Sequence, residues 1–88
     1  MKQLELKIQS DSGLHARPAS MLVALAQKYS SNIELEKNGQ KVNAKSIMSL
    51  LSLGGAKGDD VLIFIEGEDE LAAADAVTEF FTVTLVHA

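Results

Sequence analysis

The side chains best suited to chemistry lie in one short segment, residues 13–19, with the sequence GLHARPA. A neutral imidazole is a nucleophile near neutral pH, and a guanidinium stays protonated at any relevant pH. His15 and Arg17, two residues apart, could therefore accept a phosphoryl group and stabilise the charge on its oxygens. A single histidine near a helix start is more often a surface residue or a cap, so the surrounding sequence has to support the chemical interpretation.

Pro18 indicates that a helix begins in this segment. Proline has no N–H and a helical φ, so a helix tolerates it in the first turn but not in its interior. The following stretch is rich in Ala, Leu and Met and has no Gly or further Pro, which predicts a helix over roughly residues 16–28. His15 then lies at or just before the first turn, where the N–H groups of Ala16 and Arg17 lack helical acceptors and favour a bound anion.

A second informative segment, residues 43–54, has the sequence NAKSIMSLLSLG. Ser46 is well placed as the N-cap of a short helix over about residues 47–53, and Gly54 is well placed to end it. As a cap, Ser46 contributes about 1 kcal/mol to such a helix. Three glycines within residues 54–58 predict a flexible connection after it.

The pattern of apolar residues predicts four strands. Residues 3–8 alternate as a half-buried strand. Asn38-Gly39 lies between two further alternating stretches and predicts a tight hairpin over residues 32–43. The continuous apolar run at residues 61–65 suits a central strand better than an edge strand.

The two longer helices each carry an apolar stripe that we expect to be core. The first stripe consists of Ala19, Leu22, Val23, Ala26 and Tyr29, and the second, in a helix that opens at residues 68–70, of Leu71, Ala74, Val77 and Phe81. The element order is βαββαβα, which predicts an α+β protein of two layers with the helices on one face of a four-stranded sheet. This pattern alone also allows a ferredoxin-like fold with an added helix.

Composition predicts one soluble domain. The chain has 88 residues, of which 47% are hydrophobic, no cysteine and only two histidines, so we expect neither disulfides nor a metal site. The N-terminus has no run typical of a signal peptide, and no stretch approaches the ~18 consecutive apolar residues of a membrane span. We therefore expect a cytoplasmic protein.

The net charge of −4 hides an uneven distribution. Residues 12–57 hold six basic and two acidic side chains, whereas residues 58–88 hold eight acidic side chains and no Lys or Arg. The half with His15 and Ser46 is locally basic, which favours phosphoryl groups and acidic partner surfaces, although such an imbalance also simply keeps a small protein soluble. The overall negative charge argues against nucleic-acid binding.

These segments together resemble the HPr family, the histidine-containing phosphocarriers of the bacterial phosphoenolpyruvate-dependent sugar phosphotransferase system. The resemblance runs from about residue 2 to residue 78 and rests on four segments in the family's order and spacing, residues 12–19, 35–39, 42–53 and 56–58. It implies one HPr-like domain over residues 1–88. It also implies an open-faced sandwich, with an antiparallel sheet of strand order 1-4-2-3 covered on one face by three helices.

The resemblance further implies the activity. A phospho-histidine on enzyme I donates the phosphoryl group to Nδ1 of His15, and the sugar-specific IIA components accept it, without a cofactor. Arg17 and the Ala16 amide would stabilise the phosphate oxygens. Ser12 can add its hydroxyl, although an ordinary loop residue is the preferred interpretation of it. A free-standing enzyme is a weaker hypothesis, because one His and one Arg on a small convex domain provide no substrate pocket.

The short helix carries more apolar side chains than one helix can bury on a sheet. We expect Ile47, Met48 and Leu51 to be partly exposed beside His15 and to belong to a docking surface for several partners. The expected members of that surface are Ser20, Met21, Ala24, Lys45, Ile47, Met48 and Leu51. The alternative is that Met48 and Leu51 are core residues.

The resemblance gives Ser46 a second role, as the residue that HPr kinase/phosphorylase modifies in many Gram-positive bacteria. A phosphate there adds about −1.5 to −2 charges, which would oppose an acidic partner and could create a surface for a catabolite-control transcription regulator.

Two alternative functions of the chain stay open. One is a nitrogen-branch phosphocarrier, although residues 45–48 look more like the sugar branch. The other is a regulatory module that acts only through phospho-Ser46; such modules lack the active-site histidine, so His15 argues against it as the sole role.

The C-terminal residues 78–88, TEFFTVTLVHA, depart from the family pattern. The family commonly ends its last helix with a charged, amphipathic turn, whereas this tail is β-branched and aromatic. It predicts either a less regular terminus or a helix extended against its propensity. We expect His87 at the surface and the chain as a monomer.

Overall fold

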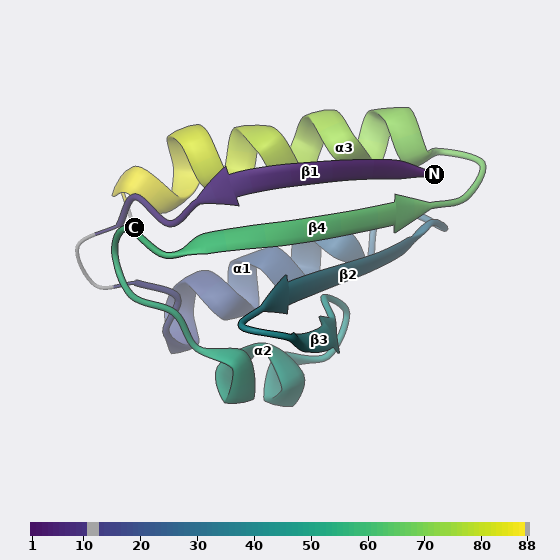
Figure 1. Ribbon diagram of the computed structural model, residues 1–88. Coiled ribbons are helices and arrows are strands. Elements are labelled where there is room, and N and C mark those ends of the chain that lie inside the picture. Colours follow the sequence, from purple (N-terminus) through teal and green to yellow (C-terminus); the bar gives the residue numbers. More distant parts are fainter. Residues whose placement is uncertain (11–12, 88) are drawn as a thin grey trace.

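The chain folds in the predicted order βαββαβα (Figure 1). The computed structural model describes residues 1–10 and 13–87. The elements are β1 (Lys2–Lys7), α1 (Ala16–Ala26), β2 (Asn32–Lys37), β3 (Gln40–Asn43), α2 (Ile47–Leu53), β4 (Asp60–Glu66) and α3 (Glu70–Glu79). Two short helical segments, η1 (Phe80–Thr84) and η2 (Leu85–His87), continue α3.

The strands form one antiparallel sheet in the order β1-β4-β2-β3, which confirms the expected sandwich and excludes the ferredoxin-like alternative. The central position of β4 is also confirmed, because Ile63 pairs with Leu4 of β1 on one side and with Leu35 of β2 on the other. Its odd-numbered residues point to the helices and are fully buried, while Leu62 and Phe64 lie half-buried on the opposite face. The sheet is therefore covered on one side only.

The hairpin between β2 and β3 has the predicted two-residue turn. Asn38 and Gly39 have φ angles of 54° and 83°, which are the left-handed values that a tight hairpin turn requires at both central positions. Asn and Gly adopt these values more readily than other residues do. The turn sets the register, with Lys37 opposite Gln40 and Leu35 opposite Val42.

The core lies between the sheet and the helices. It contains Ala19, Leu22 and Ala26 from α1, Leu50 and Leu53 from α2, and Ala73, Ala74 and Val77 from α3, packed on Ile33, Leu35, Val61, Ile63 and Ile65. The stripe predicted for α1 is confirmed at these three positions, whereas Val23 and Tyr29 are only half-buried. The helix also ends two residues earlier than predicted, because Lys28 and Tyr29 bond to carbonyls three residues back in a tighter turn.

The expected burial of Leu71 is wrong, since this side chain is 65% exposed. The buried stripe of α3 is centred on Ala73 and Val77 and continues to Phe80 and Phe81. At about 100° of rotation per residue, Leu71 lies roughly 200° around the helix from Ala73 and so faces solvent. Residues 71–74 are all apolar, so the sequence alone did not decide which of them face the core.

The apolar tail extends α3 but not as a regular α-helix. The Leu85 N–H bonds to the Phe80 carbonyl, five residues back, which is the wider spacing of a π turn. Phe80, Phe81 and Leu85 are buried, and the two rings meet edge to face at 5.7 Å between centroids. The Thr82 hydroxyl donates to the Thr78 carbonyl at 2.8 Å, a local bond that competes with the helical ladder. The tail thus supplies core residues.

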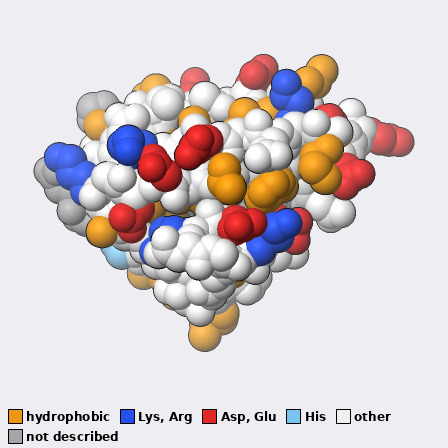
Figure 2. Space-filling model, in the orientation of Figure 1, with side chains coloured by type: hydrophobic (Ala, Val, Ile, Leu, Met, Phe, Trp, Pro, Cys, Tyr) orange, Lys and Arg blue, Asp and Glu red, His pale blue; other side chains and the backbone are white. Residues whose placement is uncertain are grey.

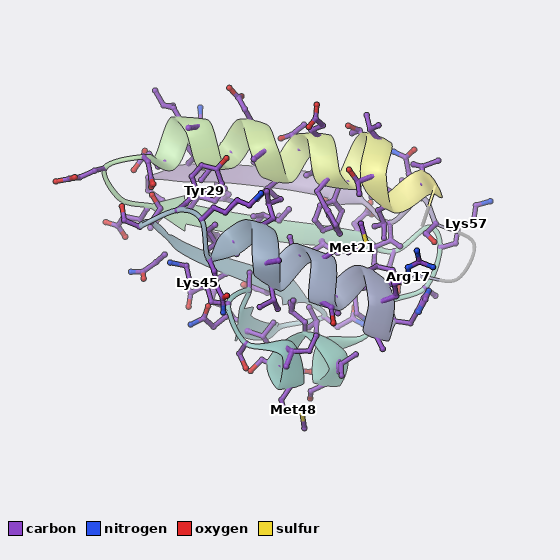
Figure 3. All side chains as sticks on the ribbon, turned by 180° about the vertical axis from the view of Figure 1, so that it is seen from behind. Arg17, Met21, Tyr29, Lys45, Met48 and Lys57 are labelled. Carbon is purple, nitrogen blue, oxygen red and sulfur yellow. The ribbon has the colours of Figure 1, made fainter. Side chains whose placement is uncertain are left out.

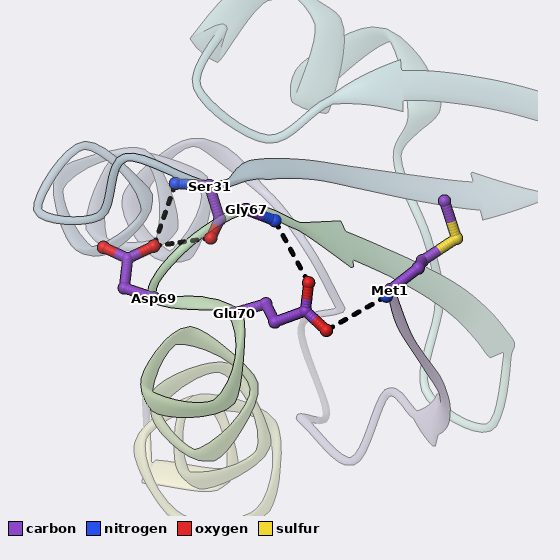
Figure 4. Close-up of polar contacts among 5 residues, drawn as sticks. All are labelled: Met1, Ser31, Gly67, Asp69 and Glu70. Carbon is purple, nitrogen blue, oxygen red and sulfur yellow. Dashed lines mark hydrogen bonds and ion pairs between the residues drawn. The ribbon is translucent and has the colours of Figure 1, made fainter.

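Two carboxylates at the start of α3 tie three segments of the chain together (Figure 4). Asp69 accepts hydrogen bonds from the Ser30 N–H at 2.9 Å, the Ser31 N–H at 3.0 Å and the Ser31 hydroxyl. Glu70 accepts one from the Gly67 N–H at 3.2 Å and pairs with the Met1 α-amino group at 3.0 Å. The Ser31 hydroxyl, followed by the Ser30 N–H, lowers the pKa of Asp69 below its ordinary value.

Asp69→Asn should lower the stability of the protein at neutral pH and flatten its dependence on acid pH. Because the pKa of Asp69 is lower in the folded chain than in the unfolded chain, its stabilisation is complete above the unfolded value and is lost as the pH falls through the folded value. Urea unfolding at neutral pH and at successively lower pH measures this difference, which should shrink below the ordinary carboxyl pKa of about 3.9. Asp75→Asn, at an exposed position of the same helix, is the control. An equal loss at every pH would contradict the assignment.

Candidate functional site

The loop before α1 is held by a close approach between two backbone segments. The Leu14 N–H donates to the Gly55 carbonyl at 3.1 Å, and the Gly13 N–H donates to the Ser10 carbonyl at 3.0 Å. Gly13 has a φ of 71°, and a Cβ at this position would lie 2.1 Å from the Gly55 oxygen. Only glycine fits, so the loop that precedes His15 is fixed against the loop that follows α2.

Hydrogen bonds tie that second loop to the residue that follows β1, and the flexibility predicted from its glycines stays a prediction. The Gly58 N–H donates to the Ile8 carbonyl at 2.7 Å, and the Ala56 N–H donates to the Asp59 carboxylate at 2.9 Å. Gly55 permits close packing, since a Cβ there would lie 2.4 Å from the side chain of Ile8, whereas a Cβ on Gly58 would have nothing within 4 Å. The Gly54-Gly55 pair is visible in the sequence, but the sequence does not show that Ile8 packs closely against Gly55.

His15 is the N-cap residue of α1. Its backbone is extended, with φ −112° and ψ −168°, and its carbonyl accepts the first helical hydrogen bond from the Ala19 N–H at 2.9 Å. The side chain is exposed and makes no capping hydrogen bond. Leu14 before it is 3% exposed and anchors the loop in the core. The imidazole therefore projects from a fixed backbone.

Arg17 follows in the first turn of α1, and like Ala16 it is exposed. The N–H groups of Ala16 and Arg17 precede the first helical hydrogen bond, so the helix itself provides them with no acceptor. Arg17 pairs with no carboxylate among the residues that the structure describes. Pro18 is buried as the structural residue of this turn. Ser12, the other residue predicted to contact phosphate, lies outside the described residues.

Ser46 caps α2 as predicted. Its hydroxyl accepts a hydrogen bond from the Ser49 N–H at 3.3 Å, and its carbonyl accepts from the Leu50 N–H at 3.1 Å. Gly54 ends the helix with a φ of 64°. The Ser46 side chain is partly accessible.

The apolar residues of α2 divide into a buried and an exposed set. Leu50 and Leu53 are buried, whereas Met48 is 74% and Leu51 41% exposed. The alternative that Met48 and Leu51 are core residues is therefore excluded. Ile47 is half-buried against the core.

The predicted docking surface is divided by α1, on which Ser20, Met21 and Ala24 are exposed. Met21 and Ala24 line a groove of about 300 Å³ between α1, α3 and η1. Figure 3 shows Met21 on this side of α1, whereas Met48 projects from the tip of α2 on the other side. The sequence placed these side chains in one group because it could not show which side of α1 each one occupies.

Lys45 does not project into solvent. Its ammonium donates to the Tyr29 carbonyl at 2.8 Å and so fastens the loop before α2 to the turn that ends α1. Figure 3 shows Lys45 and Tyr29 at one end of α1 and Arg17 and Lys57 at the other. Sequence reasoning missed this contact, which joins residues 16 positions apart and has no local signal.

The positive charge of residues 12–57 is spread over the molecule rather than gathered at His15. Lys37 pairs with Asp59 at 3.7 Å, and the Lys41 ammonium lies 4.2 Å from the centroid of the Phe64 ring, on the open face of the sheet. Lys45 makes an internal contact and Lys28 follows the last turn of α1, so Arg17 and Lys57 are the cations of this segment at the end where α1 begins (Figure 3).

Among the residues that the structure describes, no helix is long and apolar enough to cross a membrane. Within residues 1–10 and 13–87, no three His, Cys, Asp or Glu side chains are arranged so that they could hold a metal ion.

Known proteins match this chain over almost its whole length. A family profile described as "PTS HPr component phosphorylation site" matches residues 2–82. A crystal structure of HPr from Thermoanaerobacter tengcongensis is 44% identical with a TM-score of 0.92, over 97% of this chain and 96% of that one. HPr from Bacillus anthracis is 36% identical with a TM-score of 0.87, over 92% and 96% of the two chains. Crh, the catabolite-repression protein of Bacillus subtilis, is 41% identical with a TM-score of 0.74, over 92% and 93%, in a structure described as a domain-swapped dimer.

Proposed function

Because this chain belongs to the HPr family, we propose that it accepts a phosphoryl group from phospho-enzyme I on His15 and passes it to IIA components. HPr proteins are phosphocarrier components of the phosphotransferase system that serves sugar transport, and they are not enzymes. The observation that carries the assignment to His15 is its position. An exposed imidazole, without a capping bond, projects from the N-cap of α1 on a backbone that the Gly13–Gly55 contact holds in place.

The bonds that form and break in the transfer involve only the two histidines and the phosphoryl group. A lone pair on a ring nitrogen of neutral His15 attacks the phosphorus, and the N–P bond to the enzyme I histidine breaks. Its electron pair returns to that imidazole. A second transfer of the same kind discharges the carrier: a IIA histidine attacks the phosphorus, and the N–P bond to His15 breaks. Arg17 and the N–H groups of the first turn are near enough in the chain to stabilise the charge on the phosphoryl oxygens.

A carrier must not hold its phosphoryl group too firmly. Stabilising phospho-His15 by a further ~1.4 kcal/mol would reduce the equilibrium for onward transfer tenfold. The exposed position of His15, with one arginine beside it, suits this requirement because solvent weakens each contact. A buried site with several arginines would make transfer to IIA less favourable.

His15→Ala should abolish phosphorylation and leave the fold intact, because the side chain is exposed. Incubation with enzyme I, Mg²⁺ and phosphoenolpyruvate, followed by intact mass and ³¹P NMR, should show one acid-labile phosphoryl group in the natural chain and none in the variant. His87→Ala removes the other histidine and should still be phosphorylated. Phosphorylation of the His15→Ala variant would mean that another residue is the acceptor.

Arg17→Ala should slow phosphoryl transfer by about tenfold to a hundredfold. Removal of a buried hydrogen-bond donor to an oxyanion slows a reaction by about a hundredfold or more, and the effect should be smaller here because the site is exposed. Its stability should change little, because the side chain is exposed and unpaired among the described residues. Rapid-quench measurement of transfer from phospho-enzyme I gives the rate. Lys28→Ala removes one exposed positive charge elsewhere and should transfer normally; an equal loss in both variants would attribute the effect to net charge.

We propose that enzyme I and the IIA components dock on the exposed part of α2 and the adjoining face of α1. Met48 and Leu51 supply accessible apolar area, Ile47 is half-buried beside Met48 in the chain, and Ser20 is exposed on α1, which contacts α2. A methionine adapts its shape to different partners, which suits a surface that serves a donor and several acceptors. Lys45 would support this surface through Tyr29 rather than contact a partner by its ammonium. A cytoplasmic location and a monomeric state stay predictions.

We also propose regulation through Ser46, which the similarity to Crh supports. Its hydroxyl is accessible at the start of α2, two residues from Met48. A phosphate there would place about −1.5 to −2 charges beside the docking surface and repel an acidic partner. The alternative of a module that acts through phospho-Ser46 alone, with a transcription regulator as its partner, differs in requiring no transfer from His15.

Ser46→Asp should weaken binding to enzyme I several-fold, because it adds a negative charge while keeping a residue that caps helices well. Ser46→Ala is the matched variant: it should lose about 1 kcal/mol of stability with the cap but bind enzyme I normally. Titration calorimetry and urea unfolding separate the two effects. Unchanged affinity of the Ser46→Asp variant would place Ser46 outside the interface.

A further inference from the structure

The face of the sheet opposite the helices is a mixed apolar and acidic surface. The residues of β4 that point outward include Leu62 and Phe64, which are half-buried. Acidic side chains flank them on the neighbouring strands, Glu5 on β1 and Glu34 and Glu36 on β2. Figure 2 shows this face, with hydrophobic side chains gathered between acidic and basic ones.

This face contains a pocket of about 250 Å³ at its Met1 end. The residues that line it include Met1, Asn32, Glu34, Asn43, Phe64 and Glu66. The register explains why they meet: Glu34 lies between Phe64 of β4 and Asn43 of β3, and Asn32 lies opposite Glu66. The two carboxylates are diagonal neighbours on adjacent strands, with carboxamides and an aromatic ring around them.

The two carboxylates of the pocket have no ion-pair partner within residues 1–10 and 13–87. Neither Glu34 nor Glu66 pairs with a basic group of the described residues, and the Met1 α-amino group is engaged by Glu70. Lys7, the lysine of β1 on this face, lies at the opposite end of the strand and is paired with Asp60 at 2.9 Å. The negative charge of Glu34 and Glu66 is thus available to an incoming group.

An ammonium group already uses the same ring. Lys41 of β3 places its Nζ 4.2 Å from the centroid of Phe64, in the range of a cation–π contact. This internal contact shows which chemistry the ring favours, because an aromatic face attracts a cation through its quadrupole. A guest cation in the pocket would meet the two carboxylates together with the same ring.

We infer that the open face of the sheet is a second docking surface, which binds a positively charged segment of a partner protein through a Lys or Arg side chain inserted between Glu34 and Glu66. The Asn32 and Asn43 carboxamides offer hydrogen-bond acceptors to the cation, and Leu62 and Phe64 offer apolar area to its neighbours. Charge complementarity selects a basic occupant. The surface lies on the other side of the sheet from α1 and α2, so a partner there leaves His15 accessible. This inference is independent of the proposed function.

The test is an NMR titration of the full ¹⁵N-labelled chain with a capped peptide of alternating Arg and Val residues. Amide shifts should concentrate at residues 32–34, 43 and 64–66. A peptide with citrulline in place of arginine has nearly the same shape without the charge, and it should bind at least tenfold more weakly.

Three variants should change the binding of the arginine peptide in three different ways. The double variant Glu34→Gln with Glu66→Gln should weaken binding of the arginine peptide at least tenfold. Lys41→Gln removes the competing internal cation and should strengthen binding. Glu68→Gln with Asp75→Asn removes the same charge from exposed positions outside the pocket and should bind like the natural chain.

Four outcomes would overturn the inference: shifts spread over all acidic residues, equal binding of the citrulline peptide, an equal loss in the two double variants, or no gain with Lys41→Gln. Binding of agmatine alone with the affinity of the peptide would make the pocket a small-amine site instead of a docking surface. Well-dispersed spectra of each free variant establish that it is folded.

Discussion

One-sided burial of the sheet is the constraint on which the rest of the molecule depends. Val61, Ile63 and Ile65 of the central strand point to the same side, and the helices must cover that side to remove them from water. Because every helix is committed to this layer, the two faces of the sheet differ in chemistry. His15 and α2 belong to the helical side, whereas the acidic pocket lies on the side left open.

The position of His15 follows from backbone contacts more than from side-chain contacts. The chain must turn from β1 into α1 beside the loop that leads from α2 to β4, and the two segments meet at Gly13 and Gly55 without room for a Cβ. Leu14 then enters the core, and the next three residues are left in solvent at the start of α1. A rigid backbone with an exposed side chain gives a carrier a fixed geometry without strong retention of its cargo.

Charge is organised differently in space than along the chain. The basic half of the sequence places Lys45 on the Tyr29 carbonyl, Lys37 on Asp59 and Lys41 on Phe64, where each serves packing or pairing. Arg17 and Lys57 lie at the end of α1 at which His15 is the N-cap. The acidic groups are likewise divided, since Asp69 and Glu70 hold the start of α3 while Glu34 and Glu66 stay unpaired in the described chain.

Local chemistry in the sequence determined the order of the elements, the Asn38-Gly39 turn, the Ser46 cap, and the start of α1 at His15 and Pro18, because each depends on the conformations open to a few adjacent residues. The prediction of the strand order rested on the family resemblance, because the apolar pattern alone also allowed a ferredoxin-like topology. Only the tertiary structure decided that Leu71 faces solvent, that Lys45 fastens α1, and that Met21 and Met48 lie on different sides of it. These outcomes depend on contacts between residues far apart in the chain. Periodicity along a helix predicts which residues share a face, but it does not predict which other element packs against that face.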